Sequence, residues 1–289
     1  MVYNNNQSIS PDKIISHYTY QGDFYQVKDW TFDYAGNKTN SKGYNDCLCF
    51  VLVRSGQFTF DLCNKSYEMH TGRLVIDKPN YEYSLHPAPG QCSIFNFTDD
   101  FYAAITEEYN LGKVSFFSNK NILARMLSST AAIDYLHYQV LQSIHESGRL
   151  EIDTLVLELL KQIIEEITNK PLDILPSSTG KTNHLTAIER AKAYMNEHFP
   201  EDISLLRLSR YCYVSPFYLS RLFKSFTGLP PHKYLQEVRF KHAAMLIKHS
   251  DMPIMDICFS SGFSNTDYFS AAFTKKFKVP PSRYKSLSR

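Results

Sequence analysis

The chain has 289 residues, of which 43% are hydrophobic and 21% are charged. This size and hydrophobic content predict two domains with well-packed cores. No apolar run is long enough to span a bilayer, and the first residues lack the pattern of a secretion signal, so we expect a soluble, cytoplasmic protein without membrane contacts.

The net charge of only +2 conceals an uneven charge distribution. Residues 1–180 contain 14 basic and 21 acidic residues, a net charge of −7, whereas residues 181–289 contain 17 and 8, a net charge of +9. Because phosphates supply most nonspecific affinity for nucleic acid, a basic C-terminal region indicates a polyanionic partner for that region alone.

The first part of the chain is predicted to be β-structure. Short β-branched and aromatic runs at residues 47–54, 57–63 and 66–70 alternate with turn residues, which is typical of a small β-barrel. We expect a sensing domain over residues 1–118, whose aromatic side chains either stack on a small effector such as a sugar or simply form the core. The candidate effector-binding residues are Trp30, Phe58, Phe60, Tyr81 and Tyr83.

Residues 119–169 change to a helical pattern, and the last helix there is unusually apolar. Its apolar arc is roughly 200° wide, about twice what a helix with one buried side needs. This segment therefore either joins the barrel to a second copy, giving a homodimer, or is an internal helix of a single chain. The candidate dimerisation residues are Val156, Leu160, Ile163 and Ile167.

An interdomain linker is predicted over residues 170–184, which are rich in Pro, Ser, Thr and Gly. The domain that follows, residues 185–289, contains an internal repeat, because residues 215–234 recur as residues 265–284. Six positions are identical at this spacing of 50, which indicates a duplicated module. The identical pairs are Tyr218/Tyr268, Ser220/Ser270, Phe223/Phe273, Pro230/Pro280, Pro231/Pro281 and Tyr234/Tyr284.

Each copy is predicted to be an apolar helix, a tight turn and a second helix. This is the helix-turn-helix pattern, in which the second helix enters the DNA major groove. The two motifs span residues 205–226 and 254–277, and a helix over residues 232–249, about 27 Å long, would separate them. Since one DNA turn is about 34 Å, both motifs could bind one duplex, so we expect promoter DNA as the partner.

The second helix of the first copy has two distinct faces at about 100° per residue. The predicted core residues are Leu219, Leu222, Phe223 and Phe226. The opposite face carries Phe217, Ser220, Arg221 and Lys224. Arg221 is suited to a guanine edge and Lys224 to a phosphate, while the other two could touch base edges or a thymine methyl. A solvated face with one stray aromatic residue is the alternative.

The sequence from Thr186 to Tyr284 resembles the AraC/XylS family of bacterial transcription regulators. The strings are S-x-x-Y-L-S-R-L-F-K-x-x-x-G-x-x-P from Ser215, I-x-D-I-C-x-x-x-G-F-S from Ile254 and Y-F-S-x-x-F-x-K-x-F-x-x-P-P-x-x-Y from Tyr268. The resemblance implies an α+β protein with a cupin-like N-terminal barrel and an all-α DNA-binding domain. It also implies promoter binding as a dimer, activation in response to a small effector, and contact with RNA polymerase.

Carried onto this chain, the family's base-reading positions of the second copy are Thr266, Asp267, Ser270 and Ala271. The phosphate-binding positions of both copies are Ser215, Lys224, Asn265, Lys275, Lys276 and Arg283. The second copy departs from the family pattern, with Ala271 in place of an arginine, Thr274 in place of a lysine and Lys278 in place of a helix-ending glycine. The first copy is therefore predicted to carry most of the sequence specificity.

Two other classes of protein are alternatives to a DNA-binding regulator. A cupin-type metal enzyme needs clustered histidines and a carboxylate, but His70 and His86 stand alone, so neither enzymatic activity nor a metal or other cofactor is expected. The six cysteines lack zinc-site spacing and are predicted to be free thiols, although Cys47 and Cys49 could form a redox sensor. A dimeric scaffold with incidental DNA affinity is the third reading.

Overall fold

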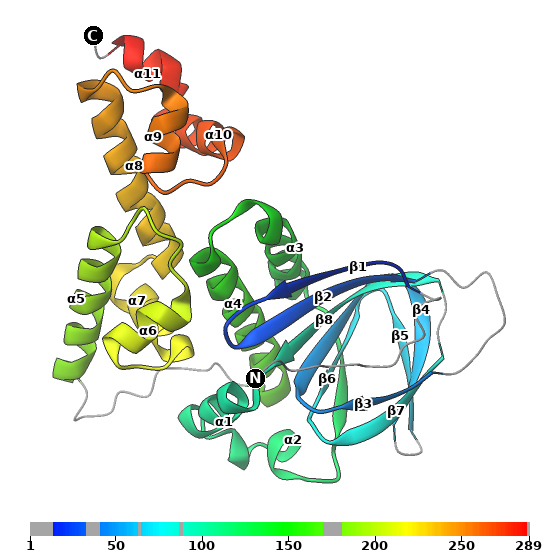
Figure 1. Cartoon of the computed structure of the whole chain (residues 1–289). Coiled ribbons are helices and arrows are strands. Elements are labelled where there is room, and N and C mark those ends of the chain that lie inside the picture. Colours follow the sequence, from blue (N-terminus) through cyan, green and yellow to red (C-terminus); the bar gives the residue numbers. More distant parts are fainter. Residues whose placement is uncertain (1–13, 33–40, 63–64, 87–88, 170–180, 288–289) are drawn as a thin grey trace. The chain divides into compact units, whose positions relative to one another are not determined.

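A computed structural model of the chain describes residues 14–32, 41–62, 65–86, 89–169 and 181–287. The chain divides into two compact units, Met1–Asp134 and Tyr135–Arg289. The first unit contains the strands and the second is helical, so the chain has a mixed α and β fold with its strands first (Figure 1). None of the helices within the described residues combines the length and apolarity needed to cross a membrane.

The first unit is built from antiparallel strands. They are β1 (Ile14–Gln21), β2 (Tyr25–Phe32), β3 (Ser41–Asn45), β4 (Leu48–Leu62), β5 (Lys65–His70), β6 (Arg73–Asp77), β7 (Tyr81–His86), β8 (Gly90–Phe97) and β9 (Ala124–Ser128). Three short helices follow β8: α1 (Asp99–Glu108), the 3-10 helix η2 (Leu111–Lys113) and α2 (Ser115–Ser118). The strand β9 lies in a stretch expected to be helical, and its hydrogen bonds to β6 extend the sheet beyond the expected boundary at residue 118.

Strand β4 connects two parts of the sheet. Residues 55–56 were expected to form a turn, but β4 continues through them with a shift in register between Val53 and Ser55. Its first half pairs with β6 and β8, and its second half pairs with β5 and β7, so one part has the order β1-β2-β8-β4-β6-β9 and the other β3-β7-β4-β5. Among the described strands no pairing joins β1 to β9, so a closed barrel is not confirmed.

The helical unit contains most of α3 and all later helices. Its helices are α3 (Ala131–Glu146), α4 (Arg149–Thr168), α5 (Lys181–Glu197), α6 (Leu205–Cys212), α7 (Pro216–Thr227), α8 (Pro231–His249), α9 (Ile254–Ser260), α10 (Thr266–Phe277) and α11 (Pro281–Leu287). Helix α5 begins inside the stretch expected to be a linker, and the rest of that stretch, residues 170–180, lies outside the described residues.

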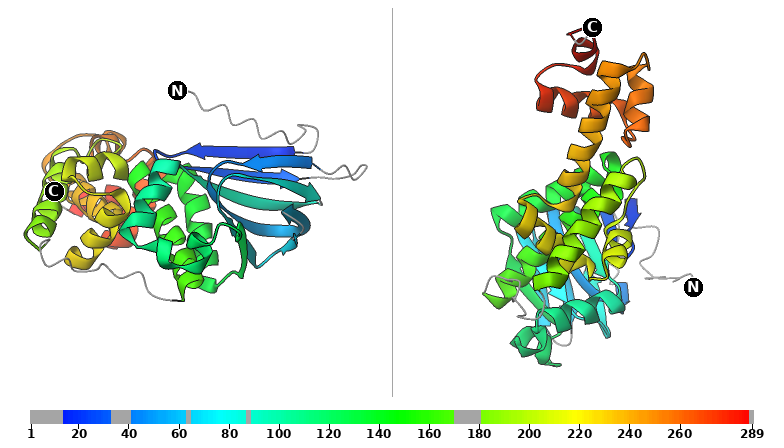
Figure 2. Two further views of the ribbon diagram at one scale, coloured as in Figure 1. Left: turned by 90° about the horizontal axis from the view of Figure 1, so that it is seen from below. Right: turned by 90° about the vertical axis from the view of Figure 1, so that its left-hand side faces the viewer.

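The two expected helix-turn-helix motifs are present as α6–α7 and α9–α10, one near each end of α8 (Figure 2). The second helix of each motif begins directly after a residue whose side chain caps it. The Ser215 hydroxyl accepts a hydrogen bond from the Tyr218 amide at 3.1 Å, with Pro216 at the first helical position. The Asn265 side chain accepts from the amides of Asp267 and Tyr268, each at 2.8 Å. Local capping therefore fixes where each second helix starts.

The turns of the two motifs use different residues for the same left-handed conformation. Gly262 has a φ of +83°, and a Cβ atom there would lie 2.6 Å from the Phe199 carbonyl oxygen. Tyr213, the residue that ends the first helix of the first motif, has a φ of +59°. Only the turn at Gly262 therefore excludes a side chain on both conformational and steric grounds.

Candidate nucleic-acid interface

The predicted reading face of α7 is largely covered. Phe217 is only 1% exposed and Ser220 8%, whereas Arg221 is half-buried and Lys224 is exposed. The expectation that Phe217 lies open to DNA is wrong for this arrangement. Phe226, expected in the core, is instead 49% exposed at the end of the helix.

Helix α4 lies against this side of the DNA-binding region and contacts α6, α7 and α8. Glu158 of α4 has its Oε1 atom 3.5 Å from Nζ of Lys224. Phe217, Ser220 and Lys224 recur at a spacing of three and four residues, which places them along one side of α7. The ion pair of Lys224 therefore identifies this side as the one that faces α4, and burial under α4 explains why Phe217 is not exposed.

Helix α4 and the segment around the start of α6 also cap one another. The amide of Leu205, the first residue of α6, donates to Oδ2 of Asp153 at 2.8 Å. The amide of Arg149, the first residue of α4, donates to Oδ1 of Asp202 at 2.9 Å. The first amides of a helix have no partner within the helix, and negative charge is favourable near them. Each segment thus supplies a carboxylate to the other's helix N-terminus.

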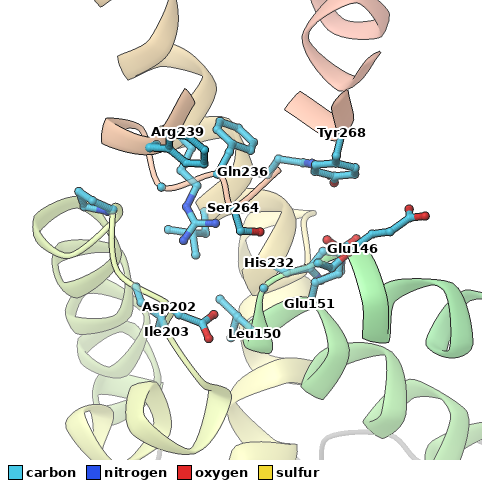
Figure 3. A pocket seen from close by; sticks show the side chains of 17 residues that line it. Glu146, Leu150, Glu151, Asp202, Ile203, His232, Gln236, Arg239, Ser264 and Tyr268 are labelled. Atoms are coloured by element: carbon cyan, nitrogen blue, oxygen red, sulfur yellow. The ribbon is translucent and has the colours of Figure 1, made fainter. Parts of the chain in front are cut away.

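A cavity of about 480 Å³ lies beside these caps, between the start of α4, the first half of α8 and the turn before α10 (Figure 3). Arg239 extends into it from α8 and is held by hydrogen bonds from Nε to the Phe199 carbonyl and from Nη2 to the Glu201 carbonyl, both 2.8 Å. Gly262 also lies close to the Phe199 carbonyl. The contacts of Arg239 and Gly262 therefore pack the second motif against the loop before α6.

His232 lines the same cavity and is about nine-tenths buried. Burial lowers the pKa of its imidazole to about 3, with smaller contributions from Lys233 and Lys224. Glu151 lies 3.9 Å from Nε2, too far for a hydrogen bond, so burial outweighs this carboxylate and the ring is neutral at pH 7.

Helix α10, the second predicted reading helix, has a more exposed predicted reading face than α7. Asp267 and Ala271 are exposed, and Thr266 and Ser270 are half-buried. Of the predicted phosphate-binding residues near it, Lys275 and Arg283 are exposed. By contrast, the ammonium of Lys276 is bound by the Glu237 carboxylate and lies 5.8 Å from the centre of the Phe240 ring, so it is engaged within the fold.

The candidate effector-binding residues form part of the packed interior of the first unit. Trp30, Phe60 and Tyr81 are buried, and Phe58 and Tyr83 are half-buried. The Phe60 ring centre lies 5.5 Å from that of Tyr83 and 6.5 Å from that of Tyr81. The structure thus places most of these rings against one another, which fits the simpler alternative that they form a core.

The four candidate dimerisation residues are buried within one chain. Val156, Leu160 and Ile163 have no exposed area, and Ile167 is 3% exposed. A dimer contact needs accessible apolar surface, so these residues do not provide one in this arrangement. The wide apolar arc of α4 instead fits the alternative of an internal helix.

Neither metal ligands nor a reactive thiol is brought together in the described part of the chain. No group of three His, Cys, Asp or Glu residues there could hold a metal ion. His86 pairs with Asp61, while Nδ1 of His70 lies 2.9 Å from a backbone carbonyl. Burial raises the pKa of Cys47 to about 12 and that of Cys49 well above its usual range, which disfavours the thiolate that redox sensing needs.

Comparison with known proteins supports this description of the C-terminal region. A family model described as a helix-turn-helix domain matches residues 208–286, the stretch that carries the AraC-type strings. Regulatory protein PocR of Salmonella typhimurium is 30% identical over 140 residues, which are 44% of this chain and 46% of PocR. The C-terminal region is an AraC-type helix-turn-helix domain.

The similarity to one relative extends beyond this domain. The lactose operon transcription activator of Staphylococcus xylosus is 23% identical over 237 residues, 81% of this chain and 82% of that protein. The match to PocR, in contrast, spans less than half of PocR. A solved regulator with an AraC-type DNA-binding domain, from Chromobacterium violaceum, is 27% identical over 37% of this chain and 96% of its own, with a TM-score of 0.35.

Sequence reasoning missed the docking of α4 on the DNA-binding region. A signal was available, because α4 carries five carboxylates among its apolar residues, whereas the C-terminal region has a surplus of positive charge. Three of these carboxylates, those of Glu151, Asp153 and Glu158, contact the DNA-binding region. A buried carboxylate requires a partner, and Asp153 is fully buried.

Proposed function

We propose that this chain is a transcriptional regulator that binds promoter DNA through both helix-turn-helix motifs. The observation that carries the proposal is the placement of α7 and α10 near the two ends of α8, which has 19 residues. Such a helix is about 28 Å long, comparable to the turn of about 34 Å that separates successive major grooves. The names of relatives such as the lactose operon activator support activation rather than repression.

The two motifs are proposed to have unequal roles. In the first, Arg221 would donate to a guanine edge and Lys224 would bind a phosphate. In the second, the exposed Asp267 would be repelled by phosphates, so Lys275 and Arg283 would mainly position the protein on the duplex. The exposure of these two cations supports this division.

The N-terminal sheets are proposed to bind a small effector, for which a sugar or an aromatic acid suits the aromatic side chains around Phe60. Such an effector alters DNA binding only if it has different affinities for two arrangements of the protein. A panel of these compounds should shift the melting temperature or the DNA affinity. No change in either quantity with any compound would contradict an effector role. Activation would further require contact with RNA polymerase.

The test of DNA binding begins with selection of genomic fragments that the full chain retains. Affinity for a selected fragment is then measured by fluorescence anisotropy at several salt concentrations. We expect a steep loss of affinity with salt, with a slope of about 0.9 for each phosphate contact. No preference for any fragment over heparin, or a flat salt dependence, would contradict the proposal and favour a scaffold. Metal analysis of the same preparation addresses the alternative of a metal enzyme.

A further inference from the structure

We propose that α4 competes with DNA for the first reading helix, because its acidic side occupies the surface of α7 that DNA would bind. The inference depends on the proposed DNA-binding role of α7 and concerns how access to that helix is controlled. Steric, electrostatic and geometric observations support it separately.

The steric observation is the burial of the reading side chains. A base-reading side chain must come within hydrogen-bond distance, about 3 Å, of a base edge in the groove. Phe217 and Ser220 lie on the side of α7 that faces α4 and are 1% and 8% exposed, and Nη1 of Arg221 is shielded from solvent. Docking of α4 and insertion of α7 into a major groove therefore exclude one another.

The electrostatic observation is the match between the acidic residues of α4 and nearby lysines. Glu158 lies 3.5 Å from the ammonium of Lys224, and Glu151 lies 3.5 Å from that of Lys233. The two glutamates are seven residues apart, close to two helical turns, so they lie on one side of α4. Their carboxylates bind basic side chains that would otherwise be available to phosphates.

The geometric observation is the pair of reciprocal caps. Asp153 is fully buried and accepts from the Leu205 amide, while Asp202 accepts from the Arg149 amide. A buried carboxylate without a hydrogen-bond donor is costly, so Asp153 favours this particular docking geometry over a loose electrostatic contact. The interface is therefore specific enough to hold α4 over α7.

The consequence is that DNA affinity depends on the fraction of molecules in which α4 has left α7. The apparent dissociation constant equals the intrinsic one divided by that fraction. Since α10 exposes Asp267 and Ala271, the second motif can meet DNA while α7 is covered. Release of α4 would then add the contacts of the first motif.

The experiment compares Glu158→Lys with Glu166→Lys in the full chain. Glu166 is exposed on the same helix, so its variant carries the same change of charge and serves as the control. Glu158→Lys repels Lys224 and should bind a selected DNA fragment about tenfold more tightly than Glu166→Lys, because a larger fraction is undocked. Equal affinities of the two variants would overturn the proposal.

A second measurement tests docking without DNA. A thiol introduced as Ser220→Cys should react slowly with a maleimide in the otherwise unchanged chain and about tenfold faster when combined with Glu158→Lys, since labelling requires the undocked fraction. Combination with Glu166→Lys should leave the labelling rate unchanged. Fast labelling in every background would overturn the proposal. Slow labelling that Glu158→Lys accelerates, without DNA binding by any variant, would overturn the proposed function instead.

Discussion

The two helix-turn-helix motifs share one architecture but differ in their surroundings. The reading side of α7 lies under α4, with Phe217 and Ser220 buried, whereas α10 exposes Asp267 and Ala271. The covered motif is also the one whose reading face contains a cation, Arg221. Under the proposed roles of the two motifs, docking of α4 would control the motif with the greater capacity to discriminate between sequences, while the other motif stays accessible.

The motifs also differ in the residues that adopt the left-handed conformation, both in the turn between the two helices and at the end of the second helix. The turn before α10 requires Gly262, whereas the turn before α7 contains Tyr213. The end of α7 uses Gly228, with a φ of +73°, and the end of α10 uses Lys278, with a φ of +65°. Glycine adopts this conformation without strain and a residue with a side chain does not. Each motif thus contains one favourable and one strained site, at opposite ends of its second helix.

The largest expected effect on stability comes from Gly262→Ala in the second motif. The added Cβ would meet the Phe199 carbonyl oxygen at 2.6 Å while the backbone keeps a positive φ. We expect a loss of about 3 kcal/mol in the free energy of unfolding, measured with urea. The control is Gly228→Ala, which has a similar φ but no atom within 4 Å of the added Cβ, and should cost only about 1 kcal/mol. Equal losses would contradict the steric argument.

The next effect concerns DNA affinity and the unequal roles of the motifs. Arg221→Ala should weaken binding to a selected fragment by about 1 to 3 kcal/mol, because a side chain suited to two hydrogen bonds with guanine is lost. Asp267→Ala in the second motif should leave affinity unchanged or improve it. Titration by fluorescence anisotropy measures both. Equal losses for the two variants would show that the ranking of the motifs is wrong.

The buried His232 should make the free energy of unfolding depend on pH. The counterpart of His232 in the second motif, Ser282, is exposed and has no titratable side chain. The imidazole has a pKa of about 3 in the folded chain and an ordinary value of 6.5. Between these values the unfolded chain binds a proton that the folded chain does not, so stability falls as the pH drops below 6.5. The contribution of His232 is about 1.4 kcal/mol per pH unit. Urea unfolding at pH 7, 6 and 5 should therefore show a shallower decline for His232→Gln, and identical declines would contradict its burial as a neutral group.

The smallest expected effect is a gain in stability from Lys278→Gly. This substitution gives α10 the same left-handed terminal residue that ends α7, and removes a strain of about 1 kcal/mol. The melting temperature should rise slightly. Replacement of the exposed Lys275 by glycine within the helix is the control and should lower it, because glycine is a poor helix former. A fall with Lys278→Gly would contradict the assigned conformation.

The sequence predicted the structure correctly where neighbouring residues alone determine the local conformation. The helix, turn and second helix of each repeat are present as predicted, because the caps at Ser215 and Asn265 and the turn at Gly262 depend on a few adjacent residues. The continuation of β4 through residues 55–56 was missed because pairing with strands on both sides overrode a local turn signal. The expected closed barrel is not confirmed among the described strands, and closure likewise depends on long-range pairing that local patterns do not reveal.

The candidate site was predicted only in part, because burial depends on contacts distant in sequence. The helical wheel correctly separated Lys224 from Leu222 and Phe223, yet it could not show that α4 covers Phe217. In the same way, the pattern of α4 could not decide between a dimer contact and an internal position for Leu160. Position on a helix face follows from spacing, whereas the identity of the neighbour requires the fold.

The most direct test of the central claim is a hydroxyl-radical footprint of the full chain on a selected DNA fragment. Binding by both motifs predicts two protected regions about 10 base pairs apart on one face of the duplex. Arg221→Ala should weaken protection in one of these regions more than in the other. A single protected region, or uniform protection along the fragment, would contradict an account in which α7 and α10 enter successive major grooves.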